Sequence, residues 1–412
     1  MHTPPPRKIL YAAAVPLHLY TFWVPYVRHF RAKGWTVDGA AAGISAFPGL
    51  KGVFDNTFDV QFTRYPLKKP IAALTGSVSV FRQIRNLLTH GGYDIVHLNT
   101  MTAGFMIRLA SRRRAALPKV IYTSHGFHFF KGNHWWRNAL YHNLEAVASR
   151  WTDLIITMNA EDYGAARRFR GISPQHIVLT PGIGVDLSFY RRKENHVREE
   201  IGLLPGQVLL LVIAEMTPNK RHADSIAALL RLGRTDIHLA FAGNGMLELE
   251  LRKRVSEAGL QDRVHFLGFR RDIPELLSAA DALLHPTERE GLPKCVLEAM
   301  SVGTPVIATN IRGNADLLGD GRGLLYPLGD TSALAACIVR VIEDKAAVAE
   351  MTARASEHVK NYKLERVLAL HERIYEMAMN GAQDANLNLA PVNRSTTRPL
   401  PVASTTGNIP SE

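Results

Sequence analysis

The sequence predicts an α/β protein built from two doubly wound parallel-sheet domains. Short apolar runs alternate with amphipathic segments along nearly the whole chain, and near-continuous apolar strands are typical of parallel sheets that helices cover on both faces. The runs form two series, separated by the charged segment "RRKENHVREEIGLLPG", which ends in Pro-Gly. We therefore expect one domain over 1–190 and a second over 191–360.

Each expected strand is a short run rich in apolar residues and bounded by turn signals. A helix over 361–380 is expected to pack back on the first domain, and 381–412 is too polar to bury a core and is expected to form a disordered tail. The expected strands are 8–14, 36–42, 94–98, 119–124, 153–158 and 176–180 in the first series, and 208–214, 237–243, 263–268, 281–285, 305–309 and 323–327 in the second.

Composition narrows the class of protein further. The chain has 412 residues, of which 46% are hydrophobic and 21% charged, as in ordinary globular proteins. Its two cysteines, Cys295 and Cys337, are too few for a disulfide framework or a four-cysteine zinc site and fit a reducing compartment. No apolar run approaches the ~18 residues that a membrane-spanning helix needs.

The net charge of +12 predicts an anionic partner. Basic residues gather in 28–35 and 108–119, but no nucleic-acid recognition motif accompanies them, so no nucleic-acid partner is expected. An anionic membrane surface fits better, with Arg108, Arg112, Arg113, Arg114 and Lys119 as the expected contacts. The alternative is that these residues only solvate helix faces.

Two glutamates stand out in "EREGLPKCVLEAM", residues 288–300. Glu290 lies on the connection after an expected strand, and Glu298 lies within the helix that follows, with Pro293 in its first turn and Gly303 as its C-cap. Ligands of open α/β sheets bind at this edge, where helix N-termini favour anions. Carboxylates there suit hydroxyl donors, so a nucleotide-sugar fits; the alternative is two surface glutamates.

Four segments of the second half carry a family resemblance: "AEMTPNKRH", "LAFAGNG", "RVHFLGFRRDIPELLSAADALLHPTEREGLPKCVLEAMSVGTPVIATNIRG" and "GLLYPLGD". They resemble the family-four retaining glycosyltransferases of the GT-B fold, in which two Rossmann-like doubly wound parallel-sheet domains face each other across a cleft. Glu290 and Glu298 match the family's Glu-x7-Glu element. In the first half, "HLNTMTAG", "YTSHGFHFFKG", "TDLIITMNAED" and "TPGIGVDLSFY" are similar to the branch that serves capsule, exopolysaccharide and O-antigen assembly.

The resemblance implies donor-site roles in the second domain. Glu298 would accept hydrogen bonds from the ribose, and Glu290 would hold hydroxyls of the donor sugar. Lys220 would neutralise the diphosphate leaving group. Many relatives carry an arginine shortly before that lysine, but Glu215 stands near that place here. Arg221 or a helix dipole is expected to compensate.

Backbone and first-domain residues complete the expected site. Gly291 and Leu292 are expected to face the sugar and the phosphate. His125 is expected to face the donor sugar across the cleft, with Gly126 beside it allowing close approach and His128 standing behind it. Asn99 and Thr100 are expected at the acceptor side of the cleft. Asn159 and Glu161 are expected either to organise the side between the domains or to cap a helix.

The implied activity is transfer of a hexosyl or N-acetylhexosaminyl group from a nucleotide-sugar, by family frequency a UDP-sugar, to a glycan or polyprenyl-diphosphate-linked acceptor. Transfer would retain the anomeric configuration and serve cell-surface polysaccharide biosynthesis. No two aspartates are separated by a single residue, the spacing that holds Mn²⁺ or Mg²⁺ in the other major transferase fold, so no metal is expected. No cofactor is expected either, because the nucleotide-sugar is a substrate. The expected location is cytoplasmic, peripheral on the inner face of the cytoplasmic membrane.

Two other functions remain open at this point. A nucleotide-sugar epimerase can use the same two-domain fold, and it would turn over its donor without an acceptor. A catalytically silent binding protein would show neither donor hydrolysis nor transfer.

Overall fold

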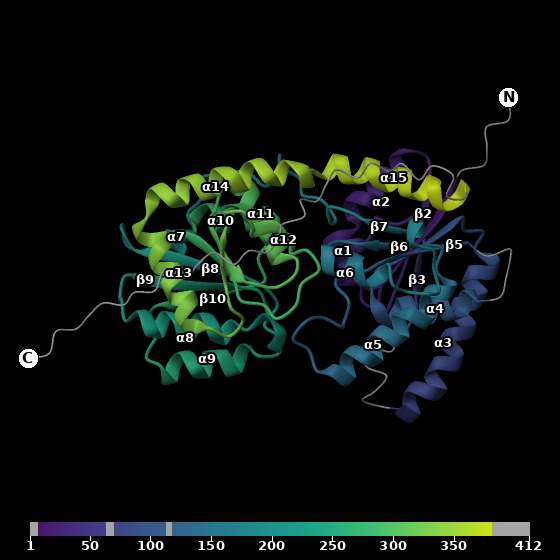
Figure 1. Ribbon diagram of the computed structural model, residues 1–412, viewed down its shortest axis with the longest axis horizontal. Coiled ribbons are helices and arrows are strands. Elements are labelled where there is room, and N and C mark those ends of the chain that lie inside the picture. The colour runs from purple at the N-terminus through teal and green to yellow at the C-terminus, as the bar shows by residue number, and fades with distance from the viewer. Residues whose placement is uncertain (1–6, 63–69, 113–117, 381–412) are drawn as a thin grey trace, which may run out of the picture.

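The computed structural model describes residues 7–62, 70–112 and 118–380, so the expected disordered tail over 381–412 lies outside the described residues. The chain forms two wholly parallel sheets, of seven and six strands, with helices on both faces of each (Figure 1). This arrangement confirms the predicted fold class of two doubly wound α/β domains.

The first sheet has the strand order β3-β2-β1-β4-β5-β6-β7. Its order reverses between β1 and β4, which pair with Ile9 opposite Ile95 and Ala12 opposite Leu98. The strands are β1 (Lys8–Ala12), β2 (Thr36–Ala41), β3 (Thr57–Asp59), β4 (Ile95–Leu98), β5 (Lys119–Thr123), β6 (Leu154–Thr157) and β7 (Ile177–Leu179).

The second sheet has the order β10-β9-β8-β11-β12-β13 and reverses between β8 and β11. There, Ala282 and Leu283 of β11 pair with Leu210 and Leu211 of β8. The strands are β8 (Val208–Ile213), β9 (Ile237–Ala242), β10 (Val264–Gly268), β11 (Ala282–His285), β12 (Val306–Thr309) and β13 (Leu324–Tyr326).

Helices connect successive strands of both sheets. Those of the first half are α1 (Pro16–Phe22), α2 (Val24–Ala32), α3 (Pro70–His90), α4 (Met101–Ser111), α5 (Trp135–Ala148) and α6 (Ala160–Ala166). Those of the second half are α7 (Val197–Glu200), α8 (His222–Leu232), α9 (Glu248–Glu257), α10 (Ile273–Ala279), α11 (Lys294–Val302), α12 (Asn314–Leu318), α13 (Thr331–Glu343), α14 (Lys345–Val359) and α15 (Leu364–Asn380).

Every strand expected from the sequence is present, and one further strand, β3, was not expected. β3 has three residues, none of them fully buried, and it lies at the edge of the first sheet beside β2. An edge strand this short has no apolar run, because its stability comes from ladder hydrogen bonds rather than from burial on two faces.

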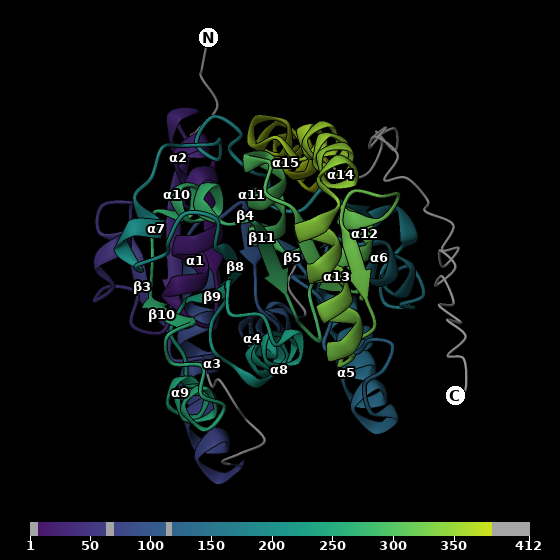
Figure 2. The ribbon, with the colours of Figure 1, turned by 90° about the vertical axis from the view of Figure 1, so that its left-hand side faces the viewer.

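The last two helices join the two domains. α14 runs along the second domain and α15 continues in nearly the same direction along the first (Figures 1 and 2). Val367, Ile374 and Tyr375 of α15 pack in one core cluster with Ile9 and Tyr11 of β1. The hydroxyls of Tyr11 and Tyr375 lie 2.9 Å apart, so this contact between chain ends is both apolar and hydrogen-bonded.

Candidate active site

Polar side chains lie where the strand order of each sheet reverses. Asn99 and Thr100 directly follow β4 in the first sheet. In the second sheet, His285 ends β11, and Lys220 lies in a short 3-10 helix after β8. Doubly wound sheets bind ligands at this switch point, outside the carboxyl ends of the strands.

Glu290 lies between β11 and α11 and contacts two basic side chains. Lys220 Nζ donates to Glu290 Oε1 in an ion pair, and His285 Nε2 lies 3.1 Å from the same oxygen. On the other side of the imidazole, His285 Nδ1 lies 3.5 Å from Cys295 Sγ. Within the described residues, both side-chain hydrogen bonds of Glu290 are made by Oε1, so Oε2 can accept from a ligand hydroxyl.

The electrostatics of this cluster favour ionised partners. Burial acts to raise the pKa of Glu290, but Lys220 and His285 together hold it well below its usual range. Burial acts to lower the pKa of Lys220, yet pairing with Glu290 leaves it above its ordinary value. Burial also opposes the charge on His285, but Cys295 and Glu290 raise its pKa to about 9. At neutral pH a carboxylate therefore lies between an ammonium and an imidazolium.

Glu298 lies in the second turn of α11 and is buried, so the alternative of a solvated surface glutamate does not hold. Its carboxylate lies 3.2 Å from Lys294 Nζ. Burial and the nearby Glu298 raise the pKa of the Tyr190 hydroxyl. The helix begins after Pro293 and ends at Gly303, whose φ of 84° is left-handed, as the sequence predicted.

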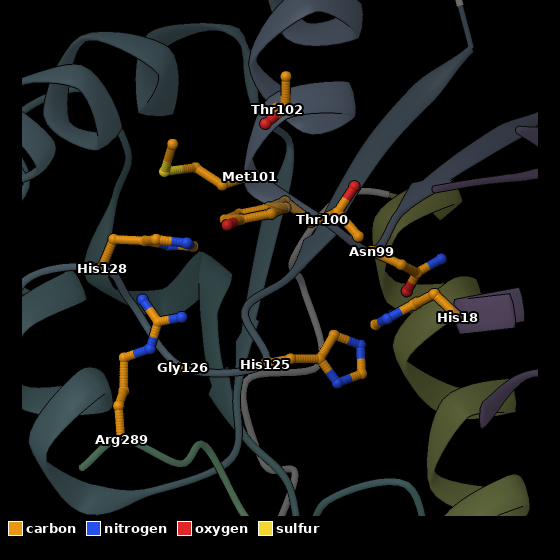
Figure 3. Close-up of a pocket in the computed structure, with 10 residues that line it drawn as sticks. His18, Asn99, Thr100, Met101, Thr102, His125, Gly126, His128 and Arg289 are labelled. Atoms are coloured by element: carbon orange, nitrogen blue, oxygen red, sulfur yellow. The ribbon is translucent and has the colours of Figure 1, made fainter. Parts of the chain in front are cut away.

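A pocket of about 270 Å³ lies at the carboxyl ends of β4 and β5 (Figure 3). It brings together four residues that the sequence placed at the cleft, Asn99, Thr100, His125 and Gly126. The full lining is His18, Asn99, Thr100, Met101, Thr102, Tyr122, His125, Gly126, His128 and, from the second domain, Arg289.

Three atoms of this lining are buried without a hydrogen-bond partner among the described residues: His18 Nε2, Asn99 Oδ1 and His125 Nε2. The rings of His18 and His125 meet edge to face with centroids 4.5 Å apart. Burial lowers the pKa of both imidazoles, that of His18 to about 4, so both are neutral at pH 7. An unpaired buried polar atom costs ~1–3 kcal/mol, and a hydroxyl-bearing ligand would pair these three.

Two glycines bring the domains into backbone contact beside this pocket. Gly126 has a φ of 108°, and a Cβ there would lie 3.0 Å from Gly291 N. A Cβ on Gly291 would lie 2.5 Å from the carbonyl of His125. Larger residues would force the loops apart, because the obstructing atoms belong to the backbone. Leu292 packs between the two domain cores, and the roles of Gly291 and Leu292 towards sugar and phosphate stay predictions.

Asn159 serves both purposes that the sequence left open. Its Oδ1 accepts from Asp162 N at 2.8 Å and caps α6, and its Nδ2 donates to Gly291 O of the other domain at 3.0 Å. Glu161 also reaches across, with Oε1 lying 3.6 Å from Arg312 Nη1.

Arg312 is a residue that the sequence did not single out. It lies in the connection after β12, and its Nη1 donates to Asp162 of the first domain at 2.5 Å and to Phe129 O at 3.1 Å. Its Nη2 donates to Phe127 O, and its Nε to Glu290 O at 3.3 Å. One buried guanidinium thus ties the loop that carries His125 to the loop that carries Glu290, a link that only the tertiary structure reveals.

His128 and Arg289 also depart from the sequence reading. His128 was expected behind the site, but it lines the pocket, and the Arg289 guanidinium points towards it (Figure 3). Burial, then the charges of Arg289 and Arg312, lower the pKa of His128 to about 3. His285 ends a predicted strand five residues before Glu290, so its position alone could have indicated a site residue. Arg289 directly precedes Glu290 in the sequence, but no local pattern distinguishes it from an ordinary surface arginine.

Arg221 and Glu215 bear on how the missing family arginine is replaced. The guanidinium of Arg221 pairs with Asp224 at 2.6 Å and with Glu288 at 3.2 Å, and its backbone has a φ of 46°. Glu215 is exposed. Because two carboxylates already engage Arg221, its role in binding the donor stays a prediction.

One of the five residues predicted as membrane contacts in 108–119 does not face solvent. Arg108 is fully buried and its Nη2 lies 2.8 Å from Glu145 Oε2, so it cannot face a membrane. Lys119 lies 3.5 Å from Asp153, and Arg112 is exposed. Arg113 and Arg114 lie outside the described residues.

No group of three or more His, Cys, Asp or Glu side chains within 7–62, 70–112 and 118–380 is placed to hold a metal ion. In the same part of the chain, no helix has the length and apolarity needed to span a bilayer.

Comparison with known proteins places both halves in glycosyltransferase families. Residues 23–189 match the family model described as Glycosyltransferase Family 4, and residues 193–361 match Glycosyl transferases group 1. EpsD of Bacillus subtilis (strain 168), named provisionally as a glycosyltransferase, is 35% identical over 80% of this chain and 86% of its own length. The Escherichia coli enzyme UDP-Gal:alpha-D-GlcNAc-diphosphoundecaprenol alpha-1,3-galactosyltransferase is 29% identical over 67% of this chain and 74% of its own.

Solved structures share the fold. HepE from Anabaena, solved with UDP and glucose, superposes with a TM-score of 0.71 at 21% identity, over 90% of this chain and 99% of that one. Sucrose-phosphate synthase from Thermosynechococcus elongatus superposes with a TM-score of 0.73 at 19% identity, over 91% and 99%.

Proposed function

Because this chain belongs to the family-four glycosyltransferases of the GT-B fold, we propose that it transfers a sugar from a UDP-sugar to a polyprenyl-diphosphate-linked acceptor, with retention at the anomeric carbon. The names of two similar proteins support the substrates: HepE was solved with UDP, and the Escherichia coli relative acts on a diphosphoundecaprenol-linked sugar. The reaction would serve the assembly of a cell-surface polysaccharide, such as a capsule or an exopolysaccharide.

The observation that carries the proposal is the Lys220–Glu290–His285 cluster at the switch point of the second sheet. An ammonium has three N–H donors, and one of those on Lys220 is used by Glu290. The other two can bind the donor diphosphate and stabilise the charge that grows on it as the glycosidic bond breaks. Glu290 Oε2 would accept from a hydroxyl of the transferred sugar.

Residues around this cluster take the remaining roles. Glu298 would accept from the ribose hydroxyls. It is buried and lies in the second turn of α11, whereas Glu290 lies on the connection before the helix, so the two carboxylates would contact different parts of the donor. Across the domain contact, neutral His125 and Asn99 would pair their free atoms with sugar hydroxyls in the pocket.

We favour attack of the acceptor on the same face of the sugar that the diphosphate leaves. The acceptor oxygen forms the new bond to the anomeric carbon as the bond from that carbon to the phosphate oxygen breaks. The departing phosphate oxygen takes the proton of the acceptor hydroxyl, so UDP leaves protonated and no protein base is needed. His125 fits this scheme as a hydrogen-bonding group, because its lowered pKa keeps it neutral.

The proposed place of action is the cytoplasmic face of the membrane, where a lipid-linked acceptor is accessible, and the proposed catalysis needs no metal. A thermal-shift screen of UDP-, GDP- and ADP-sugars tests the donor, because only a ligand that binds the native state raises the melting temperature. We expect the largest shift with a UDP-sugar. Turnover of the donor without any acceptor would favour an epimerase instead, and absence of both hydrolysis and transfer across many acceptors would favour a silent binding protein.

A further inference from the structure

The outer face of α5 is apolar and exposed. The residues concerned are Trp135, which is 81% exposed, Trp136 (49%), Leu140 (37%) and Val147 (40%). Trp136, Leu140 and Val147 lie four and eleven residues apart, a spacing that places them on one face of a helix. Trp135 precedes this stripe by one residue, about 100° around the helix, and stands beside it at the start of α5. Single apolar residues on a surface need no explanation, but an exposed apolar stripe with a second exposed tryptophan beside it marks an interaction site.

The opposite face of α5 is locked to the domain. Glu145 is buried, lies 2.8 Å from Arg108 Nη2 and accepts from the hydroxyl of Tyr122 at 3.2 Å. The Arg108 guanidinium also stacks over the Tyr122 ring, 4.1 Å from its centroid. Rotating α5 to bury its tryptophans would move Glu145 away from Arg108 and leave that buried guanidinium without its carboxylate. The apolar face of α5 is therefore held outward.

The charge around this face is positive. Between residues 131 and 150 the only acidic residue is Glu145, which Arg108 neutralises inside the domain. Lys131, Arg137 and Arg150 are exposed. One exposed carboxylate lies beside this segment: Glu161 accepts from Lys131 N at 3.3 Å, and its Oε1 also lies 3.6 Å from Arg312 Nη1. The three exposed cations outnumber it, and a surface with interfacial tryptophans, apolar residues and a surplus of cations complements an anionic lipid interface.

We propose that α5 docks on an anionic bilayer, with Trp135 and Trp136 at the depth of the lipid headgroups. The proposal rests on the proposed lipid-linked acceptor. The membrane contact is assigned to α5 and not to Arg108, which is buried. α5 forms part of the lower edge of the first domain in Figure 1. The tryptophan rings enter the interface while the basic side chains contact anionic headgroups.

The docking face is joined to the pocket by a short, hydrogen-bonded segment. His128, which lines the pocket, accepts from Asn133 Nδ2 through its carbonyl at 3.2 Å. Asn138 of α5 binds both the amide and the carbonyl of Phe130, at 3.1 and 3.0 Å. These hydrogen bonds connect the docking face directly to the segment that lines the pocket. A bilayer that contacts α5 would therefore present a lipid-linked acceptor near the pocket.

The test is co-sedimentation with vesicles of phosphatidylcholine alone and of phosphatidylcholine with phosphatidylglycerol, at low salt. The wild type should bind the anionic vesicles, and its tryptophan fluorescence should shift to the blue. The Trp135→Ala/Trp136→Ala variant should lose at least about tenfold in partitioning, since each aromatic side chain contributes to burial at the interface. The matched control is Leu204→Ala/Leu230→Ala, which removes two exposed apolar residues of the second domain and should bind like the wild type.

Transfer assays separate this proposal from the proposed function. The Trp135→Ala/Trp136→Ala variant should act normally on a short, soluble acceptor analogue and slowly on an acceptor embedded in anionic vesicles. Wild-type vesicle binding by this variant, or equal binding of the wild type to neutral vesicles, would overturn the docking proposal. So would concentration-dependent dimerisation through α5 without vesicle binding, measured by analytical ultracentrifugation. Failure of transfer to every acceptor, with vesicle binding intact, would count against the proposed function alone.

Discussion

Replacing Lys220 with alanine should separate the structural and chemical roles of its ammonium. The side chains of Lys220 and Glu290 are 23% and 15% exposed, so the pair is only partly shielded from water. After the change, Glu290 keeps His285 at 3.1 Å, and the carboxylate is not left without a positive partner. We therefore expect a stability loss of about 1–2 kcal/mol, less than the ~3–5 kcal/mol for breaking a fully buried pair.

The effect on turnover should be much larger than the effect on stability. Loss of one preorganised group that stabilises transition-state charge lowers kcat by ~10²–10³ in other enzymes. A loss of kcat of the same order is expected for Lys220→Ala. Among the described residues, no other ammonium or guanidinium contacts the carboxylate of Glu290, so no neighbouring cation of the cluster can replace Lys220. The assay is the rate of UDP release at saturating donor and acceptor, with the melting temperature measured on the same preparation.

Lys193→Ala is the matched control. Lys193 pairs with Glu275 at 3.1 Å, and the two side chains are 30% and 29% exposed. It should lower stability by a similar or smaller amount and leave kcat unchanged. The reasoning is refuted if Lys220→Ala turns over at the wild-type rate, or if Lys193→Ala loses as much activity as Lys220→Ala.

Four further outcomes are expected. Glu298→Ala should weaken binding of the nucleotide-sugar by ~1.5–3 kcal/mol, as measured by calorimetry, because it removes a buried acceptor, whereas Glu290→Gln should mainly lower kcat. Arg312→Ala should destabilise the fold by about 3 kcal/mol in chemical denaturation, since Asp162 would lose its buried cation but keep its hydrogen bonds to Asn159 and Phe127 N. Stability should fall as pH rises from 6.5 to about 9, because His285 has a raised pKa in the folded protein and its contribution is complete only below pH 6.5; the loss is at most about 3 kcal/mol.

Two of these outcomes have a matched comparison variant. Arg252→Ala breaks an exposed pair with Glu248 within one helix and should change stability by no more than ~0.5 kcal/mol; an equal effect of Arg312→Ala would contradict the buried link between domains. His285→Gln should flatten the loss of stability between pH 6.5 and 9, and an unchanged profile would assign that loss to other groups. Wild-type donor affinity in Glu298→Ala would remove it from the ribose site.

The features that local sequence patterns predicted are those that depend only on residues close together in the chain. Buried parallel strands are apolar along their whole length, so their positions were readable, and β3 was missed because an edge strand of three residues has no such run. Glu290 and Glu298 were readable because strand, turn and helix signals fix their places within one short segment. The left-handed C-cap at Gly303 follows from the same local logic.

Contacts between distant residues were not predictable from those patterns. Arg108 stands in a basic run and was expected at a surface, but Glu145, 37 residues later, compensates its charge inside the domain. Arg312 and Asp162 are 150 residues apart, and nothing in either neighbourhood indicates that they meet. The unpaired atoms of His18, Asn99 and His125 come from three separate connections of the first sheet, so only the fold assembles them into one pocket.

The most direct test of the account is the anomeric configuration of the product formed in the presence of EDTA. The protein would be incubated with the UDP-sugar that stabilises it most and a polyprenyl-diphosphate-linked acceptor, and the new linkage would be assigned by NMR. The account predicts transfer that survives chelation, with the α-configuration of the donor kept in the product. An inverted linkage, or activity that EDTA abolishes and Mn²⁺ restores, would contradict the proposed role of Lys220 and the same-face reaction.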